Sequence, residues 1–330
     1  MCCAAICAAT FSQSHSAIIS DPGPMKAFVA PMQGHTEGVF CKAHCEVYSG
    51  VDSYFTPFIR VEKGEVRRRD LRGIDRGFLG ETPVVPQAIF RDIDEWRQIA
   101  DAVGEAGYDE LDLNLGCPFP PQVKHGRGAA LLRNSRLLEQ LSDEMRGRSD
   151  MHFSLKMRLG VESPDEWREI IDIVNVMPLC RVTVHPRVAV QQYGGELFID
   201  VFTSIYEALQ HPVVYNGDIL TPEAIDDIVA RYPRLHGVMA GRGVMARPSL
   251  FAEWRDGREW SRDERIFKLL QLHDKVYSHY SETLCGDTQI LMKIKPFWEY
   301  LEPEIGHKAM KSIRKATSVR KYEEALNGVS

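Results

Sequence analysis

Short runs of apolar, largely β-branched residues recur along the chain, and most of them precede a longer segment with the periodicity of an amphipathic helix. These runs predict eight strands, at residues 27–30, 53–57, 84–88, 110–115, 152–157, 182–185, 213–216 and 237–240. Helical periodicity lies between most of the strands, at residues 92–106, 135–145, 164–176 and 222–230. Strands that alternate with helices predict a parallel sheet, and eight such units in about 230 residues fit a closed (β/α)8 TIM barrel better than an open sheet.

Two helix starts carry a clear local signal. At Ser163-Pro164 and at Thr221-Pro222, a residue suited to the N-cap precedes a proline, and acidic residues follow in the first turn. We therefore expect helices whose first residues are 164 and 222. The segment 61–80 is charged and irregular, and the pattern there is weak.

The strand pattern stops near residue 255, and the rest of the chain has the periodicity of amphipathic helices. We expect two domains, a barrel at 25–255 and a small all-helical domain at 256–330. The helical part contains a run of basic residues without an intervening acid: Lys308, Lys311, Arg314, Lys315, Arg320 and Lys321. A solvated helix face explains most such runs, and contact with nucleic acid is the alternative.

Composition and charge constrain the function less than the motifs do. A formal net charge of −6 gives no general support for nucleic-acid binding, so such a contact needs a local basic patch. The eight cysteines lack the density of a disulfide scaffold, which favours a reducing, cytoplasmic setting. Cys41 and Cys45 have no matching second pair of zinc ligands, and we expect no metal site.

The N-terminal segment 1–24 is mildly apolar at first but lacks the positively charged region of a secretory signal. We expect it to be a disordered tail or the product of an over-called start codon, with Met25 as the natural start. No apolar run in the chain reaches the ~18 residues that a membrane span needs, so we expect no membrane contact.

Polar residues and glycines gather where the predicted strands end. In a (β/α)8 barrel the active site lies at the carboxyl ends of the strands. The sequence places there Ala30-Pro31-Met32-Gln33-Gly34, Gln87, Asn114 and Cys117, Lys156 and Arg158, His185-Pro186-Arg187, Asn216-Gly217-Asp218 and Gly241-Arg242-Gly243. One such residue often only caps a loop, but seven of the eight strand ends are marked in this way. The pattern therefore indicates an active site in the barrel mouth.

The last two strand ends suggest a phosphorylated ligand. Glycines that precede a helix leave backbone N–H groups free to bind phosphate, and Arg242 can add a charge-assisted fork. Gln87 and Lys156 can hydrogen-bond a flat heteroaromatic ring from the barrel centre. A planar phosphorylated cofactor fits both features, and flavin mononucleotide (FMN) is the first candidate. Pyridoxal phosphate is the alternative, since Lys156 could form a Schiff base.

These motifs together resemble those of the tRNA-dihydrouridine synthase family, most closely its bacterial type. The matching elements, in the order and with the spacing of the family, are Ala30-Pro31-Met32-Gln33-Gly34, Asn114-Leu115-Gly116-Cys117-Pro118, Lys156-Met157-Arg158-Leu159-Gly160, Val184-His185-Pro186-Arg187, Asn216-Gly217-Asp218 and Gly241-Arg242-Gly243. The resemblance covers residues 26 to about 250. The helical segment that follows matches the position and length of the family's RNA-binding domain.

The resemblance implies FMN as cofactor, NADPH as reductant and tRNA as substrate. It assigns to FMN the residues Pro31, Met32, Gln33, Gln87, Lys156, His185, Asn216, Gly217, Asp218, Gly241 and Arg242. Cys117 would be the general acid that protonates C5 of uracil while hydride reaches C6. The substrate candidates are Asn114, Arg158, Arg187 and Tyr193 in the barrel, and Lys308, Lys311, Arg314 and Lys315 in the helical domain. We expect a monomer.

Two departures and three alternatives accompany the resemblance. The chain has His185-Pro186-Arg187 where the family often has His-Gly-Arg, and the loop after Cys117 is rich in proline. These differences bear on the shape of the substrate loop more than on the cofactor site. The alternatives are an FMN barrel that acts on a free small molecule, such as a dihydroorotate-dehydrogenase-like enzyme or an ene reductase, a barrel that binds tRNA without catalysis, and a pyridoxal phosphate enzyme.

Overall fold

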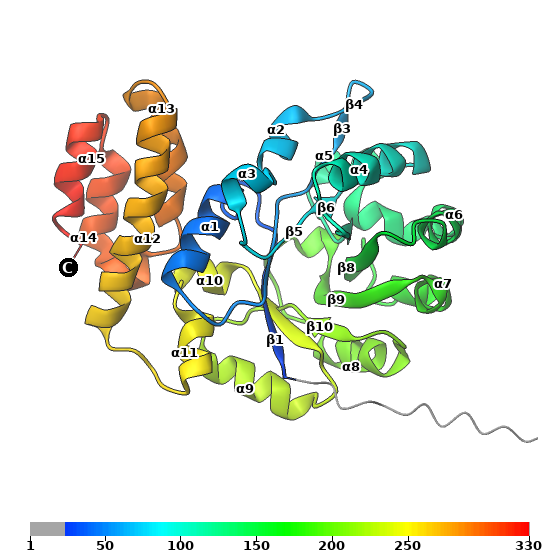
Figure 1. The fold of residues 1–330 in the computed structure, drawn as a ribbon. Coiled ribbons are helices and arrows are strands. Elements are labelled where there is room, and N and C mark those ends of the chain that lie inside the picture. Colours follow the sequence, from blue (N-terminus) through cyan, green and yellow to red (C-terminus); the bar gives the residue numbers. More distant parts are fainter. Residues whose placement is uncertain (1–23, 330) are drawn as a thin grey trace, which may run out of the picture.

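A computed structural model describes residues 24–329, and its centre is a closed parallel barrel (Figure 1). The strands are β1 (Lys26–Val29), β2 (Ser53–Phe55), β5 (Val84–Val85), β6 (Gln87–Ala88), β7 (Glu110–Leu115), β8 (His152–Gly160), β9 (Leu179–Val188), β10 (Val213–Tyr215) and β11 (Gly237–Ala240). Their order in the sheet is β5-β2-β1-β11-β10-β9-β8-β7-β6. The two end strands are halves of one chain segment, interrupted at Pro86, which has no N–H for the ladder. The sheet therefore closes on itself, and the predicted (β/α)8 barrel is confirmed.

The barrel interior has an apolar half and a polar half. Successive strand residues face opposite sides, so every second residue points inward. The apolar half is a cluster of Phe28, Ala30, Phe55, Val85, Val214 and Met239. The polar half lies on β6, β7 and β8, where Gln87 is paired in register with Asp112, Asp112 with Ser154, and Asn114 with Lys156. Polar side chains are thus stacked in two layers on one side of the barrel, beneath its mouth.

The helices that cover the barrel follow the strands as expected, with one exception. They are α1 (Gly38–Val47), α4 (Ile93–Glu105), α6 (Ser135–Arg146), α7 (Ile171–Val176), α8 (Ile199–Ala208), α9 (Pro222–Arg231), α10 (Arg242–Ala246) and α11 (Leu250–Asp256). Thr221 caps α9 as predicted, since its hydroxyl accepts the N–H of Ala224 at 3.3 Å.

The helix predicted at 164–176 is wrong in its first half. A short 3-10 helix, η2 (Glu166–Glu169), precedes α7, and the two are separate elements. The carboxylate of Glu166 accepts the N–H groups of Val161, Glu162 and Ser163 at 2.8–3.0 Å. Glu166 therefore organises the loop after β8, and Ser163 does not serve as the N-cap of a long helix.

The remaining barrel elements lie in the loops. They are β3 (Val61–Glu62), β4 (Glu65–Val66), α2 (Arg68–Arg72), α3 (Arg76–Leu79), α5 (Pro120–Lys124), η1 (Gly128–Arg133) and η3 (Ala189–Gln191). The first four occupy the charged segment where the sequence pattern was weak, and β3 and β4 form a small antiparallel hairpin.

The C-terminal part of the chain is helical and packs beside α1 at one side of the barrel, away from α6, α7 and α8 (Figure 1). Its elements are α12 (Arg262–Thr283), α13 (Asp287–Ile294), η4 (Lys295–Trp298), α14 (Glu302–Lys315) and α15 (Val319–Leu326). The buried hydroxyl of Tyr322 joins His273 and Trp298, each by a hydrogen bond of 2.7 Å, which ties three elements together. None of the helices within residues 24–329 is long and apolar enough to cross a membrane.

The segment between β1 and α1 connects the barrel mouth to the helical part. The carboxylate of Glu37 forms an ion pair with the ammonium of Lys293 at 2.7 Å, and Nε2 of His35 lies 3.3 Å from the carboxylate of Glu299. The expectation for residues 1–24 lies outside the described residues, except for its last position.

Candidate active site

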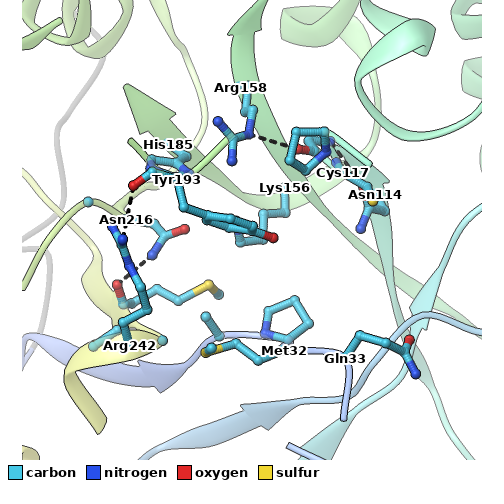
Figure 2. A pocket seen from close by; sticks show the side chains of 18 of the residues that line it. Met32, Gln33, Asn114, Cys117, Lys156, Arg158, His185, Tyr193, Asn216 and Arg242 are labelled. Atoms are coloured by element: carbon cyan, nitrogen blue, oxygen red, sulfur yellow. Dashed lines mark hydrogen bonds between the residues drawn. The ribbon is translucent and has the colours of Figure 1, made fainter. Parts of the chain in front are cut away.

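A cavity of about 460 Å³ opens at the carboxyl ends of the barrel strands. All the predicted cofactor residues line it: Pro31, Met32, Gln33, Gln87, Lys156, His185, Asn216, Gly217, Asp218, Gly241 and Arg242. Cys117, Asn114, Arg158 and Tyr193 line it as well. Figure 2 shows Cys117 and Asn114 on one side of the cavity, Asn216 and Arg242 on the opposite side, and Lys156 between them. The structure therefore brings residues from seven strand ends into one pocket.

The turn after β7 is built by Asn114. Its side-chain oxygen accepts the backbone N–H of Gly116 at 3.1 Å and that of Cys117 at 2.8 Å, which folds the chain into a tight turn at the strand end. Its amide nitrogen donates to the side-chain oxygen of Gln87 at 2.6 Å. Asn114 thus fixes where the thiol sits, a role the sequence prediction did not assign to it.

Cys117 is a partly buried thiol at the pocket wall. Burial raises its pKa, while the backbone N–H of Phe119 and the positive charges of Arg158 and Lys156 act in the opposite direction. Because burial prevails, the thiol is protonated at neutral pH. A protonated thiol that lines a ligand pocket can act as a general acid.

Two cations stand close to this thiol. Burial, and then the charge of Arg158, lowers the pKa of Lys156 to about 8. No group within residues 24–329 forms a hydrogen bond or ion pair with the Lys156 ammonium, although the side chain lines the pocket. Arg158 donates to the carbonyl oxygens of Gly116 at 2.9 Å and Val188 at 3.0 Å, and burial lowers its pKa to about 10.

His185 lines the pocket in a neutral state. Its Nε2 lies 3.2 Å from Nη1 of Arg187, and because arginine only donates, Nε2 must be the acceptor. Burial lowers the pKa of His185 well below its usual value, and the neighbouring cations Arg158 and Lys156 lower it further. His185 therefore carries its proton on Nδ1, as a neutral donor.

Arg187 lies behind the pocket wall rather than in it. It is 3% exposed and is not part of the cavity lining. Its guanidinium donates to Asp218 Oδ2 at 2.5 Å and to the carbonyl of Gly195 at 2.8 Å. This position differs from the expected contact with the uracil edge, because the donors of Arg187 are used inside the wall.

Asp218 joins the two arginines of this side of the pocket. Besides Arg187 it accepts a hydrogen bond from Arg242, which also donates to the carbonyl of Tyr193 at 2.9 Å. The Tyr193 side chain is 58% exposed, and the guanidinium of Arg158 lies 5.5 Å from its ring centroid. The ion pairs thereby anchor the Tyr193 loop over the pocket.

The basic residues predicted to meet the substrate outside the barrel are on the surface. Lys308, Lys311, Arg314 and Lys315 are exposed on α14, and none of them lines the pocket. Asp112, which the sequence reasoning passed over, lies fully buried below the pocket. The sequence could have indicated this residue, because Asp112 precedes Asn114 by two positions and therefore lies on the same face of β7.

Comparison with known proteins identifies the family. The dihydrouridine synthase (Dus) family matches residues 28–325. A tRNA-dihydrouridine(16) synthase of Neisseria meningitidis serogroup B is 29% identical over 234 residues, which cover 68% of this chain and 69% of the relative. A probable tRNA-dihydrouridine synthase 2 of Bacillus subtilis is 27% identical over 272 residues, which cover 78% of this chain and 80% of the relative.

Solved structures support the barrel fold. Morphinone reductase superposes with a TM-score of 0.50 at 12% identity, and covers 73% of this chain and 89% of its own. The family match extends over the barrel and the helical part alike, so the predicted family and its enzyme class, an oxidoreductase, are confirmed. The chain belongs to the dihydrouridine synthase family.

Proposed function

We propose that this protein reduces the C5–C6 double bond of a uridine in tRNA to 5,6-dihydrouridine, with FMN as cofactor, NADPH as reductant and Cys117 as general acid. Family membership and the names of the two relatives support the reaction and the tRNA substrate. The observation that carries the proposal is the protonated Cys117 thiol in a pocket that also holds the unpaired Lys156 ammonium.

The pocket residues fit FMN. An ammonium in a recessed pocket that has no hydrogen-bond or ion-pair partner among residues 24–329 calls for an acceptor from a ligand. The ring of a flavin carries such acceptors along one edge. Gln87 and Lys156 would hold that edge, and Pro31, Met32 and Gln33 would contact the ring. Arg242, with His185 and the segment Asn216–Asp218, would hold the phosphate side. When bound, FMN supplies the hydride for C6 of uracil, with NADPH as the source of electrons.

Cys117 and its neighbours supply the remaining chemistry. The target uridine must leave its stack to enter a pocket of this depth. Cys117 Sγ holds the proton that is transferred to C5, and the Asn114 turn keeps the thiol at the wall. Lys156 and Arg158 place positive charge where negative charge develops on the base, which stabilises the transition state.

The helical part would bind the body of the tRNA. Lys308, Lys311, Arg314 and Lys315 are exposed on α14, and such side chains form ion pairs with phosphates. We also propose a monomer in the cytoplasm. Sedimentation of the purified protein tests the first, and cell fractionation the second.

The test compares Cys117→Ala with Cys180→Ala, which removes an exposed cysteine that does not line the cavity. Cys117→Ala should bind FMN and tRNA but form dihydrouridine at least a hundredfold more slowly, whereas Cys180→Ala should match the wild type. Dihydrouridine is mapped by position in tRNA from a deletion strain. A wild-type rate for Cys117→Ala would contradict the general-acid role. Oxidation of free dihydroorotate or reduction of an enone, without any change in tRNA, would favour the small-molecule alternative.

A further inference from the structure

A fully buried carboxylate lies one layer below the pocket, on the polar side of the barrel. Asp112 is 0% exposed and is flanked in register by Gln87 on β6 and Ser154 on β8. A buried carboxylate is costly unless its oxygens accept hydrogen bonds. Here Oδ1 accepts the hydroxyl of Ser154 at 2.8 Å, and Oδ2 accepts the amide of Gln87 at 2.7 Å. The cost of burial is therefore offset by two short hydrogen bonds.

From Asp112 a continuous hydrogen-bonded chain runs to the backbone of Cys117. Gln87 donates to Asp112 with its nitrogen and accepts from Asn114 with its oxygen, the latter at 2.6 Å. Asn114 in turn accepts the N–H of Cys117 at 2.8 Å. Two side chains, Gln87 and Asn114, thus connect the buried carboxylate of Asp112 to the turn that carries the thiol.

The two ends of this hydrogen-bonded chain determine which group donates and which accepts in every hydrogen bond within it. An ionised carboxylate only accepts, so Gln87 must turn its NH2 group toward Asp112 and its oxygen toward Asn114. At the other end, backbone N–H groups only donate, so Asn114 must turn its oxygen toward Cys117. The two requirements agree: a flip of the Gln87 amide would lose two hydrogen bonds, and a flip of the Asn114 amide would lose three.

The fixed direction determines what the pocket offers to a ligand. Each amide uses one N–H in the chain and keeps a second, and both side chains line the cavity. At Gln87 and Asn114 the pocket therefore presents N–H donors, beside the Lys156 ammonium, rather than amide oxygens. Donors of this kind match a ring edge that carries carbonyl oxygens and ring nitrogens.

We propose that Asp112 is a positioning residue that fixes Gln87 and Asn114 as N–H donors toward the pocket. Through Asn114 it also holds the turn that presents the thiol of Cys117. The identity of the ligand rests on the proposed function, but the effect on the thiol does not.

Three substitutions separate this role from ordinary packing. Asp112→Leu has the branched shape of aspartate but accepts no hydrogen bond, so it releases the Gln87 amide. Asp112→Asn can keep the direction of the chain, because its oxygen can face Gln87 while its NH2 group faces the hydroxyl of Ser154. Ser154→Ala is the matched control, since it removes a buried hydrogen bond from the same carboxylate but leaves the chain to Cys117 intact.

Two measurements test the proposal, one for the position of the Cys117 thiol and one for the binding of the ligand. The first is the rate at which iodoacetamide alkylates Cys117 in the FMN-free protein, determined by peptide mapping with the exposed Cys285 as internal reference. The second is the dissociation constant of FMN, from the change in flavin fluorescence. Both use the full chain, and neither needs tRNA or turnover.

Asp112→Leu should accelerate alkylation of Cys117 at least threefold relative to Cys285, and should weaken FMN binding at least tenfold. Asp112→Asn and Ser154→Ala should both stay within threefold of the wild type. The proposal is overturned if Asp112→Leu leaves both quantities unchanged, or if Ser154→Ala has effects as large.

Two further outcomes have defined meanings. Should Asp112→Leu fail to fold, Asp112→Ser replaces it, because the serine side chain is one bond shorter and cannot reach Gln87. The expected changes in alkylation rate and FMN binding are the same as for Asp112→Leu. If the wild-type protein binds no FMN, the proposed function fails, while the alkylation rates still decide the role of Asp112.

Discussion

Gly128 lies directly against Cys117, although the two residues are separated by the whole of α5. A Cβ atom at position 128 would come within 2.8 Å of both the Cβ and the carbonyl oxygen of Cys117. Gly128 also has a φ of +61°, a conformation that residues with a Cβ rarely adopt. The N–H of Ala129 donates to the carbonyl of Cys117 at 3.1 Å, and Asn114 accepts the N–H of Cys117, so both backbone polar groups of Cys117 are held by hydrogen bonds.

Gly128→Ala should therefore displace the thiol as well as strain the backbone. We expect the free energy of unfolding to fall by about 1–3 kcal/mol and single-turnover dihydrouridine formation to slow at least tenfold. Gly126→Ala is the control, because Gly126 also has a positive φ, of +73°, but no atom within 4 Å of the added Cβ. Equal rates for the two variants would show that the contact with Cys117 does not matter for activity.

The charge of Lys156 should set an alkaline limit to FMN binding. Burial holds the pKa of this ammonium at about 8 in the free protein, so the residue is charged below pH 8 and increasingly neutral above it. Because the proposed role needs the charged form, the association constant for FMN should decline as the pH rises through about 8. Fluorescence titration of the FMN-free protein between pH 6.5 and about 9.5 measures it.

Lys156→Arg provides the control for this pH dependence. Arginine remains charged throughout that range, so the decline should disappear even if the affinity itself is lower. A decline near pH 8 that persists in Lys156→Arg must come from another group, and the assignment to Lys156 would then be wrong.

The barrel was predictable because each strand carries its own evidence. Runs such as 213–215 and 237–240 are apolar, short and flanked by proline or glycine, and a parallel strand buried on both faces needs such residues. The helix at 164–176 was misjudged because Glu166 has two possible uses. The sequence suggests an acid in the first helical turn, whereas the folded chain uses its carboxylate to collect three loop N–H groups.

Most of the predicted barrel-site residues line the pocket, although Arg187 does not, and their hydrogen-bond partners were not predictable. Asn114 and Arg187 both stand at strand ends, and the sequence gives no sign that one turns back to its own loop while the other is held by Asp218. The pairing of Arg187 with Asp218 joins residues distant in sequence, and both pairings depend on strand register and on competition among several donors. Asp112 was overlooked for the same reason, since its partners lie on the neighbouring strands β6 and β8.

The buried position of Arg187 yields a prediction that distinguishes a structural role in the pocket wall from direct contact with the substrate. Arg187→Leu removes a buried cation from Asp218 and the carbonyl of Gly195, so the free energy of unfolding should fall by about 3 kcal/mol. FMN binding should weaken as well, because Arg242 shares Asp218. Urea denaturation and flavin titration measure the two effects. A variant with normal stability and a raised KM for tRNA would instead indicate direct contact with the uracil.

The basic face of α14 should make the tRNA affinity depend on salt. Lys308→Ala combined with Lys311→Ala removes two exposed cations, and each lost phosphate contact should reduce the slope of log K against log salt by about 0.7–0.9. The control is Arg136→Ala with Arg168→Ala, which removes two exposed cations from the outer side of the barrel. Filter binding of tRNA at several salt concentrations gives both slopes. If the two double variants change the slope equally, α14 is not the surface that meets the phosphates.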